Sequence, residues 1–339
     1  MSNTLPLLGL MLGDCTGIGP EQCAKILSAG GMKDVARLRV IGDRRVLEMG
    51  ARDAGVKLDI GALDMIDLGN IDPSAIKRGA ISAESGRLTG ETLKYMIDLA
   101  LEGRIDGIVF APLNKAALHA GGWKYNDEHI MFARLTGHHG FHGEMNVLDN
   151  KWMSRVTSHV GLREALDQIT PKRIDEALTL AHETMKGAGF ANPRIAVAAL
   201  NPHGGENGLF GREEIEIIAP AVARGAERGI ACKGPFPADT VFIKGFGDEF
   251  DGVLTMYHDQ GQIATKLKGF NRGVTVTGGL KTVFATPAHG TAFDIVGKGV
   301  ASTGALEQAV RLAARLAGSR RNVTPAKAGI QQQATERNP

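Results

Sequence analysis

The stretch LLGLMLGDCTGIGPEQCAKILSAG, residues 7–30, decides the fold class. Its apolar run Leu7–Leu12 is typical of a buried strand. Glycines follow it, and Pro20–Ala29 then has the pattern of an amphipathic helix with a proline in its first turn. The same alternation recurs in Leu38–Ile41 and Arg44–Ala54. Short apolar runs that alternate with amphipathic stretches predict an α/β fold with a largely parallel sheet.

Later parts of the chain continue this alternation. Further strands are predicted at Gly107–Ala111, Arg194–Leu200, Gly252–Tyr257 and Gly273–Thr277, and long helices at Glu84–Leu101 and Pro171–Lys186. A chain of 339 residues is too long for one small core, so we expect two lobes around an interlobe cleft.

Composition excludes several classes of protein. The 39 Lys and Arg residues nearly balance 37 Asp and Glu without a long basic run, so a nucleic-acid partner is not expected. No apolar run approaches the roughly 18 residues that a membrane span needs, so a membrane partner is not expected either. Three cysteines without a CxxC pair fit a reducing compartment, and we expect a cytoplasmic protein.

Histidines follow three of the apolar runs, at the ends of strands where open α/β sheets bind ligands. They are His159 in VTSHVG, His203 in NPHGG and His258 in YHDQG. Taken alone, each is more often a loop or capping residue. Three imidazoles at equivalent positions predict a catalytic divalent cation with an open coordination position.

Two other strand-to-helix turns carry candidate residues. We assign Gly17 and Gly19 of GDCTGIGPE to cofactor binding, with a tight turn that holds no ligand as the alternative. The segment matches neither a P-loop nor a GxGxxG pattern. Lys115 in APLNKAALHAGG could supply positive charge or a proton to catalysis, or it could be an ordinary surface lysine.

The segment HGTAFDIVGKG, residues 289–299, resembles the adenosine-binding loop of decarboxylating β-hydroxyacid dehydrogenases. The resemblance implies that the backbone of His289, Gly290, Thr291 and Ala292 lines an adenine, and that Asp294 accepts a hydrogen bond from a ribose hydroxyl. A carboxylate there repels a 2′-phosphate, so NAD is expected over NADP.

Seven motifs in order, together with the rest of the chain to about residue 318, resemble the 4-hydroxythreonine-4-phosphate dehydrogenase family of pyridoxine biosynthesis and its paralogues. The motifs are GDCTGIGPE, APLNKAALHAGG, TSHVGLREA, NPHGGENGLFGREE, GPFPADTVF, YHDQG and HGTAFDIVGKG. The family implies an isocitrate/isopropylmalate-dehydrogenase-like fold and a homodimer with shared active sites. It also implies a divalent cation on His159, His203 and His258, the third of which comes from the partner subunit.

The resemblance further implies an NAD-dependent oxidoreductase that oxidises a hydroxyacid at a CH–OH group and then decarboxylates it. Zinc is the expected cation, with magnesium, cobalt and manganese as alternatives. The resemblance places Lys266 on the substrate side. Asp239 and Asp259 are candidates for orienting histidines or relaying protons, with a structural role as the alternative.

The chain departs from the family pattern at the expected substrate contacts. Glu128 and His129 replace a His-Thr pair, Thr275 replaces an asparagine, and Phe284 replaces an arginine. Arginine is the preferred partner of a phosphate, and phenylalanine cannot imitate it. The substrate could therefore be a different one, such as a sugar-acid phosphate or an aromatic dihydrodiol carboxylate. A non-catalytic relative that binds NAD or a metabolite is a further alternative.

These assignments give the predicted organisation of the chain. We expect a discontinuous cofactor-side lobe from residues 1–128 and 272–318, and a metal-binding and dimerisation lobe from residues 129–271. The polar, aperiodic stretch of residues 319–339 is expected to be a disordered tail.

Overall fold

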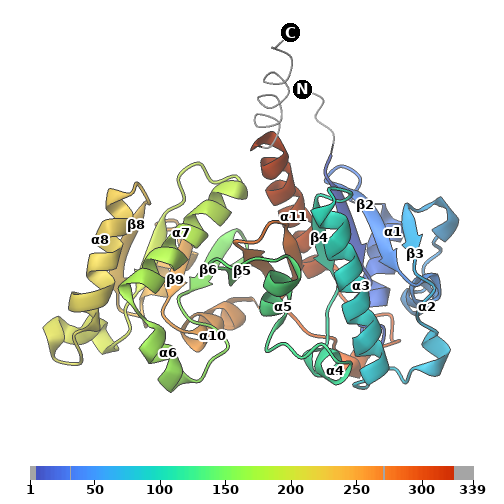
Figure 1. Cartoon of the computed structure of the whole chain (residues 1–339), viewed down its shortest axis with the longest axis horizontal. Coiled ribbons are helices and arrows are strands. Elements are labelled where there is room, and N and C mark those ends of the chain that lie inside the picture. The colour runs from blue at the N-terminus through green and yellow to red at the C-terminus, as the bar shows by residue number, and fades with distance from the viewer. Residues whose placement is uncertain (1–4, 31, 270–271, 324–339) are drawn as a thin grey trace, which may run out of the picture.

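The computed structural model describes residues 5–30, 32–269 and 272–323, and within them one eleven-stranded sheet with helices around it (Figure 1). The strand order is β3-β2-β1-β4-β11-β10-β5-β6-β9-β7-β8. The strands are β1 (Leu7–Met11), β2 (Arg37–Gly42), β3 (Met65–Asp67), β4 (Gly107–Phe110), β5 (Gly143–Leu148), β6 (Lys151–Arg155), β7 (Ile195–Ala198), β8 (Cys232–Phe236), β9 (Gly252–Thr255), β10 (Val274–Gly278) and β11 (Phe284–Pro287).

Eleven α-helices accompany this sheet in the described part of the chain. They are α1 (Gly19–Ala29), α2 (Arg44–Ala54), α3 (Ala83–Leu101), α4 (Lys115–Ala120), α5 (Glu128–Leu135), α6 (Leu162–Gln168), α7 (Pro171–Gly187), α8 (Ala219–Glu227), α9 (Val241–Phe246), α10 (His258–Gly269) and α11 (Gly304–Val323). Figure 1 shows α1–α3 at one end of the molecule, α6–α8 at the other end, and α11 between them.

The predicted α/β class with a largely parallel sheet is confirmed. Seven of the ten strand pairings within the described residues are parallel. The antiparallel pairings, β11 with β10, β10 with β5 and β5 with β6, lie together in the middle of the sheet. The two ends of the sheet therefore join through a central antiparallel segment.

Local sequence explains the first strand-to-helix unit. The strand β1 is almost wholly buried, and Pro20 lies in the first turn of α1, where a missing N–H costs no hydrogen bond. A Cβ at Gly19 would lie 2.3 Å from the carbonyl oxygen of Leu12, so only glycine allows this close turn. Gly30 then ends the helix in the left-handed region, with φ of 61°.

The helix α11 corrects the predicted start of the disordered tail. It continues through Val323 because two arginines beyond residue 318 have partners in the folded chain. Arg320 donates to the carbonyl oxygen of Leu280 at 3.0 Å, and Arg321 donates to Asp106 at 2.7 Å. The rest of the predicted tail, residues 324–339, lies outside the described residues. None of the helices in the described ranges has the length and apolar character that crossing a bilayer requires.

Candidate active site

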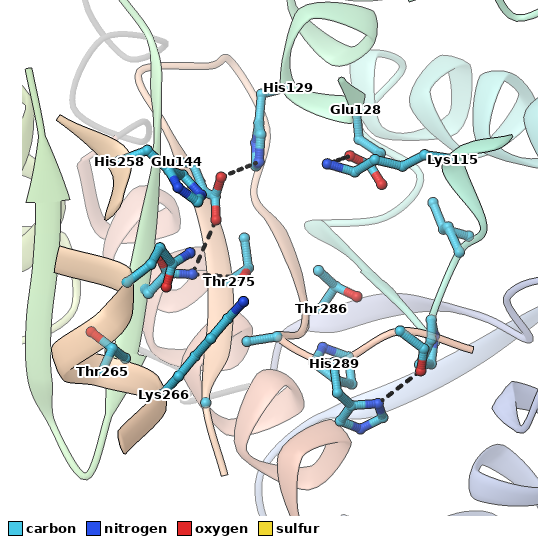
Figure 2. A pocket seen from close by; sticks show the side chains of 18 of the residues that line it. Lys115, Glu128, His129, Glu144, His258, Thr265, Lys266, Thr275, Thr286 and His289 are labelled. Carbon is cyan, nitrogen blue, oxygen red and sulfur yellow. Dashed lines mark hydrogen bonds and ion pairs between the residues drawn. The ribbon is translucent and has the colours of Figure 1, made fainter. Parts of the chain in front are cut away.

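A cavity of about 270 Å³ brings together side chains from both halves of the sheet (Figure 2). Its walls come from the starts of α4 and α5, from β5 and β10, from the loop after β6, from α10, and from the segment after β11. Nine of the predicted site residues line it, namely Lys115, Glu128, His129, His159, His258, Lys266, Thr275, His289 and Gly290. Motifs from both halves of the chain therefore meet in one pocket.

Two of the predicted metal ligands are neighbours in this pocket. The rings of His159 and His258 have centroids 5.4 Å apart. The Nδ1–H of His159 donates to Oδ2 of Asp127 at 2.9 Å, and the Nδ1–H of His258 donates to Oδ1 of Asp259 at 2.7 Å. Both rings are therefore oriented through Nδ1, as in carboxylate–histidine–metal arrangements, and Nε2 of His159 lies 3.7 Å from Oε2 of Glu144. Burial also lowers the pKa of His258, which favours the neutral ring that a metal needs.

Asp127, which was not predicted from the sequence, links His159 to the start of α5. Its Oδ1 accepts the backbone N–H of Ile130 and caps α5, while its Oδ2 accepts from His159. Burial alone would raise the pKa of Asp127, but these hydrogen bonds lower it to about 2. Its signal in the sequence was its N-cap position directly before a helical pattern.

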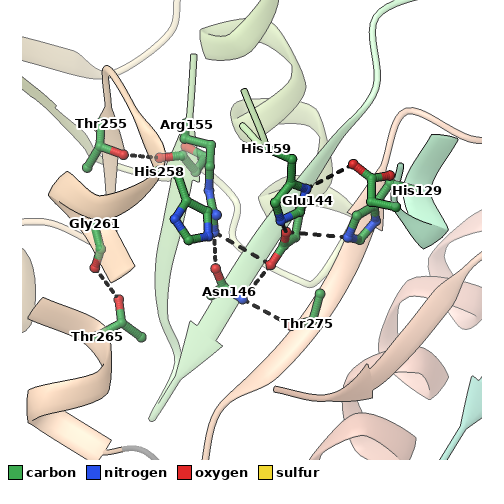
Figure 3. A network of polar contacts seen from close by, with 12 residues as sticks. His129, Glu144, Asn146, Arg155, His159, Thr255, His258, Gly261, Thr265 and Thr275 are labelled. Atoms are coloured by element: carbon green, nitrogen blue, oxygen red, sulfur yellow. Dashed lines mark hydrogen bonds and ion pairs between the residues drawn. The ribbon is translucent and has the colours of Figure 1, made fainter. Parts of the chain in front are cut away.

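A second group that the sequence analysis missed lies on β5 and β6 (Figure 3). Oε1 of Glu144 accepts from Nδ2 of Asn146 at 3.1 Å and lies 3.7 Å from Nη2 of Arg155. Its Oε2 lies 3.4 Å from Nε2 of His129 and 3.7 Å from Nε2 of His159. Burial alone would raise the pKa of Glu144, but Arg155 and His129 hold it well below its usual value.

The alternation of Glu144 and Asn146 was the signal that could have found them. Residues two apart in a strand face the same side of a sheet, and both line the pocket. Asn146 also donates to Oγ1 of Thr275 at 3.0 Å, across the β5–β10 pair. Neither β5 nor β6 was predicted from the sequence, so this polar face went unnoticed.

His129 and Glu128 lie at the start of α5, on the same wall. His129 is buried, its Nδ1 is 2.6 Å from Oγ1 of Thr277, and Glu144 raises its pKa although burial acts in the opposite direction. Glu128 pairs with Lys115 at 3.1 Å, so this predicted catalytic lysine faces a carboxylate of the pocket.

The predicted cofactor loop begins at one edge of the pocket. His289 and Gly290 line it, and no atom lies within 4 Å of a Cβ built on Gly290. Asp294 is exposed to solvent, and Ala292 adopts a left-handed backbone with φ of 45°. Thr291 is buried, and its carbonyl oxygen accepts the N–H of Ile18 at 3.1 Å.

Gly17 packs against this loop, Gly19 packs against Leu12, and neither glycine lines the pocket. Both are buried, and a Cβ at Gly17 would lie 2.7 Å from Cβ of Thr291. Glycine is needed at Gly17 so that the first turn can pack under the predicted cofactor loop. Their assignment to cofactor binding stays a prediction, and neither residue is among those that line the pocket.

Three predicted site residues lie elsewhere. His203 is exposed, has φ of 53°, and its nearest ring is that of Phe210, with centroids 6.3 Å apart. Asp239 is exposed before α9 and is not among the residues that line the pocket. Phe284 is 1% exposed and stacks on Phe132 with centroids 4.2 Å apart, so its assignment as a substrate contact is wrong. Phe284 lies at the start of β11, and α5, which carries Phe132, covers this end of the strand.

The three predicted metal ligands do not meet within one chain. Over residues 5–30, 32–269 and 272–323, no three His, Cys, Asp or Glu side chains are placed to hold a metal ion together. His258 lies beside His159 of the same chain, with ring centroids 5.4 Å apart, and which histidine a partner subunit supplies stays a prediction. His203 is the histidine that stands apart.

Comparison with known proteins decides the family. The model of the family described as "Pyridoxal phosphate biosynthetic protein PdxA" matches residues 25–313. The chain belongs to the PdxA family. A Pseudomonas aeruginosa protein with the provisional name 4-hydroxythreonine-4-phosphate dehydrogenase 2 is 47% identical over 328 residues, which cover 92% of this chain and 97% of that protein. A D-threonate 4-phosphate dehydrogenase of Cupriavidus necator is 41% identical, with coverage of 94% and 99%.

Solved structures agree with this placement in the PdxA family. A 4-hydroxythreonine-4-phosphate dehydrogenase from Burkholderia phymatum superposes with a TM-score of 0.76 at 40% identity, covering 93% of this chain and 99% of that one. A terephthalate 1,2-cis-dihydrodiol dehydrogenase from Burkholderia xenovorans gives 0.65 at 28% identity, with coverage of 91% and 98%. A β-decarboxylating dehydrogenase from Thermococcus kodakarensis, at 14% identity and 0.52, shares the fold, covering 99% of this chain and all of that one. The predicted family, fold and dehydrogenase class are confirmed.

Proposed function

We propose that this chain is a metal-dependent, NAD-linked dehydrogenase that oxidises a small hydroxyacid and then releases carbon dioxide from it. The observation that carries the proposal is the pairing of His159 and His258, whose Nδ1 atoms are both held by carboxylates at one wall of the pocket. The cofactor loop begins at the opposite wall with His289. A cation site and a nicotinamide site on either side of a cavity suit hydride removal from a metal-bound hydroxyl.

The donor set fits a borderline cation, and zinc is our first choice. Two imidazoles that are each oriented through Nδ1 suit zinc, and a third protein ligand would complete a catalytic site with an open position. When bound, the cation would lower the pKa of the substrate hydroxyl and hold charge on the decarboxylated product, while NAD would accept the hydride.

The residues of the chain then have distinct tasks. Asp127 and Asp259 orient the two histidines, and Lys266, which points into the cavity from α10 in Figure 2, attracts the substrate carboxylate. The exposed carboxylate of Asp294 is available to a ribose hydroxyl, and the open space beside Gly290 lets a ligand approach the backbone.

We further propose that His203 of the partner subunit is the third ligand, in a homodimer. His203 lies in a loop with two exposed apolar side chains, Leu209 at 73% and Phe210 at 47% exposure. The loop after His159 is also apolar, because Val160 is 36% and Leu162 is 59% exposed. Clustered exposed apolar side chains commonly mark protein interfaces.

The space for such a contact exists beside the histidine pair. A second cavity, of about 190 Å³, adjoins His159 and His258 on a wall formed by Val160, Leu162 and Tyr257. Docking the His203 loop of a partner there would bury both apolar loops and bring a third imidazole to the pair. Because a C2 contact is reciprocal, both sites of the dimer would be completed together.

The test is NADH formation by purified enzyme with zinc, NAD and a panel of hydroxyacids, with release of carbon dioxide measured in parallel. The panel includes 4-hydroxythreonine 4-phosphate, D-threonate with and without a 4-phosphate, and a dihydrodiol carboxylate. We expect turnover of at least one acid and loss of it after chelation. Absence of NADH from every acid, with metal bound, would contradict the proposal and favour a non-catalytic binding protein.

A further inference from the structure

Glu144 is a carboxylate on β5 whose side chain is 9% exposed and lines the pocket. Four side chains converge on it, namely His129 from α5, Asn146 from β5, Arg155 from β6 and His159 from the loop after β6. Arg155 also donates to the amide oxygen of Asn146, which fixes the amide so that its Nδ2 faces Glu144 and Thr275. The carboxylate is thus held by donors that belong to the protein (Figure 3).

The groups around Glu144 resemble an anion-binding site in which the carboxylate of Glu144 takes the place of a bound anion. A bound phosphate needs several N–H or O–H donors and a favourable positive charge. The donors on this wall, His129 and Asn146, already serve Glu144, and the charge of Arg155 is opposed by it. A phosphate that reached this wall would find its donors engaged and a negative charge beside it.

The neighbouring residues act in the same direction. Glu128 adds a second carboxylate to the wall, and its partner Lys115 is engaged with it. Thr275 offers a hydroxyl that accepts from Asn146, and Phe284 is in the core, out of reach of a ligand. The wall therefore presents acceptors, which suit a ligand group that donates.

We infer that Glu144 determines substrate specificity, by selecting a hydroxyacid whose end facing β5 carries a hydroxyl or ammonium donor and no phosphate. This inference rests on the proposed function for the substrate class, the hydroxyacids. It adds which end group the pocket accepts and which residue decides it. A merely structural Glu144, needed only to neutralise Arg155, would not discriminate between the two end groups.

The experiment compares the binding of D-threonate and D-threonate 4-phosphate by calorimetry, with zinc present and NAD absent. These acids differ only in the end group, so effects of a substitution on the cation cancel in the ratio of their Kd values. We expect the wild type to bind D-threonate about tenfold to hundredfold more tightly than its phosphate, and Glu144→Gln to remove most of that preference.

Two further variants make the outcome decisive. Glu227→Gln, at an exposed position on α8, removes the same charge far from the pocket residues and should leave the ratio unchanged. If Glu144→Gln does not fold by circular dichroism, the double variant Glu144→Gln/Arg155→Gln removes both buried charges and should shift the ratio in the same direction.

Tighter binding of the phosphorylated acid by the wild type would overturn the inference, and so would a ratio that no Glu144 variant changes. Because binding is measured without turnover, these outcomes do not depend on catalysis. Failure of the proposed function appears separately, as absence of NADH from every hydroxyacid while zinc is bound.

Discussion

Asp127 and His159 are joined by a 2.9 Å hydrogen bond between Oδ2 and Nδ1, although 32 residues separate them in the chain. The other oxygen of Asp127 caps α5 through the N–H of Ile130. One carboxylate thus fixes a helix start and the orientation of an imidazole. The ring is therefore oriented through its Nδ1, and its Nε2 lies 3.7 Å from Oε2 of Glu144.

From this bond we predict that Asp127→Asn weakens zinc binding by about tenfold to a hundredfold, the usual effect of losing a carboxylate behind a histidine ligand. Asparagine still caps the helix, so the fold should persist. Zinc affinity is measured by competition with a chromogenic chelator. Asp43→Asn, which changes the cap of α2 outside the pocket, is the matched control, and equal affinities in both variants would contradict the assignment.

Subunit mixing should reveal which histidine is shared. We predict that His159→Ala and His203→Ala proteins, each inactive, regain roughly a quarter of wild-type activity when mixed, since half of the dimers are mixed and each mixed dimer has one intact site. His159→Ala mixed with His258→Ala should stay inactive, because these two side chains share a site within one chain. Recovery in the second mixture alone would mean that His258 crosses the interface.

Cofactor choice should follow the charge of Asp294. Its exposed carboxylate would repel a 2′-phosphate, so we predict a kcat/KM at least about tenfold higher with NAD than with NADP. Asp294→Ser should narrow that ratio, and the measurement is initial-rate kinetics with both cofactors at saturating substrate. Equal kcat/KM values in the wild type would show that the loop binds something else.

Phe284 should matter for stability rather than for binding. Phe284→Ala removes a fully buried ring from its stack on Phe132, so we predict a loss of about 3–5 kcal/mol in the free energy of unfolding. Ile243→Ala, at a side chain that is 75% exposed, should change it by less than about 0.5 kcal/mol. Urea unfolding measures both. A Phe284→Ala protein with normal stability and altered substrate affinity would contradict this prediction and support a role for Phe284 in substrate binding.

Acid should remove the stabilising effect of Asp43. Burial alone would raise the pKa of Asp43, but Arg45 and the N–H of Ile71 lower it below the ordinary value of 3.8. The contribution of the ionised form is therefore fully present above 3.8 and is lost as the pH falls through the folded-state pKa. We predict that the difference in urea midpoint between wild type and Asp43→Asn shrinks below that pH, whereas a constant difference would point to capping alone.

The sequence predicted site residues that follow apolar runs, but it did not predict two that lie inside the strand β5. His159 and His258 follow β6 and β9, which are parallel neighbours, so the strand-end rule places them at one edge of the sheet. Lys115 follows β4, which runs opposite to β6 across three antiparallel pairings, so the rule alone does not bring it to the histidines. Glu144 and Asn146 lie inside β5, a strand that pairs antiparallel on both sides, and a pattern of parallel units gave no reason to expect it.

Other failures came from tertiary structure. Alignment with the family placed Phe284 at a substrate contact, but Phe284 lies in β11, and α5 covers that end of the strand. The packing of a helix over a strand end depends on tertiary structure, which the local sequence does not reveal. His203 lies apart from the other two histidines, and its place after an apolar run in the sequence gave no sign of this separation. Asp239 was named because it adjoins a motif, and adjacency along a chain does not bring a side chain into a pocket.

The position of β11 also bears on how the chain is made. Thr286 of β11 donates to the carbonyl oxygen of Phe110 at the end of β4, across 176 residues of sequence. While the ribosome synthesises those residues, β4 has an unpaired edge that only the late strand β11 can cover. An apolar, unpaired edge is prone to wrong partners, and contacts between distant residues form slowly. We therefore expect the nascent N-terminal half to be aggregation-prone and dependent on chaperones until β11 emerges.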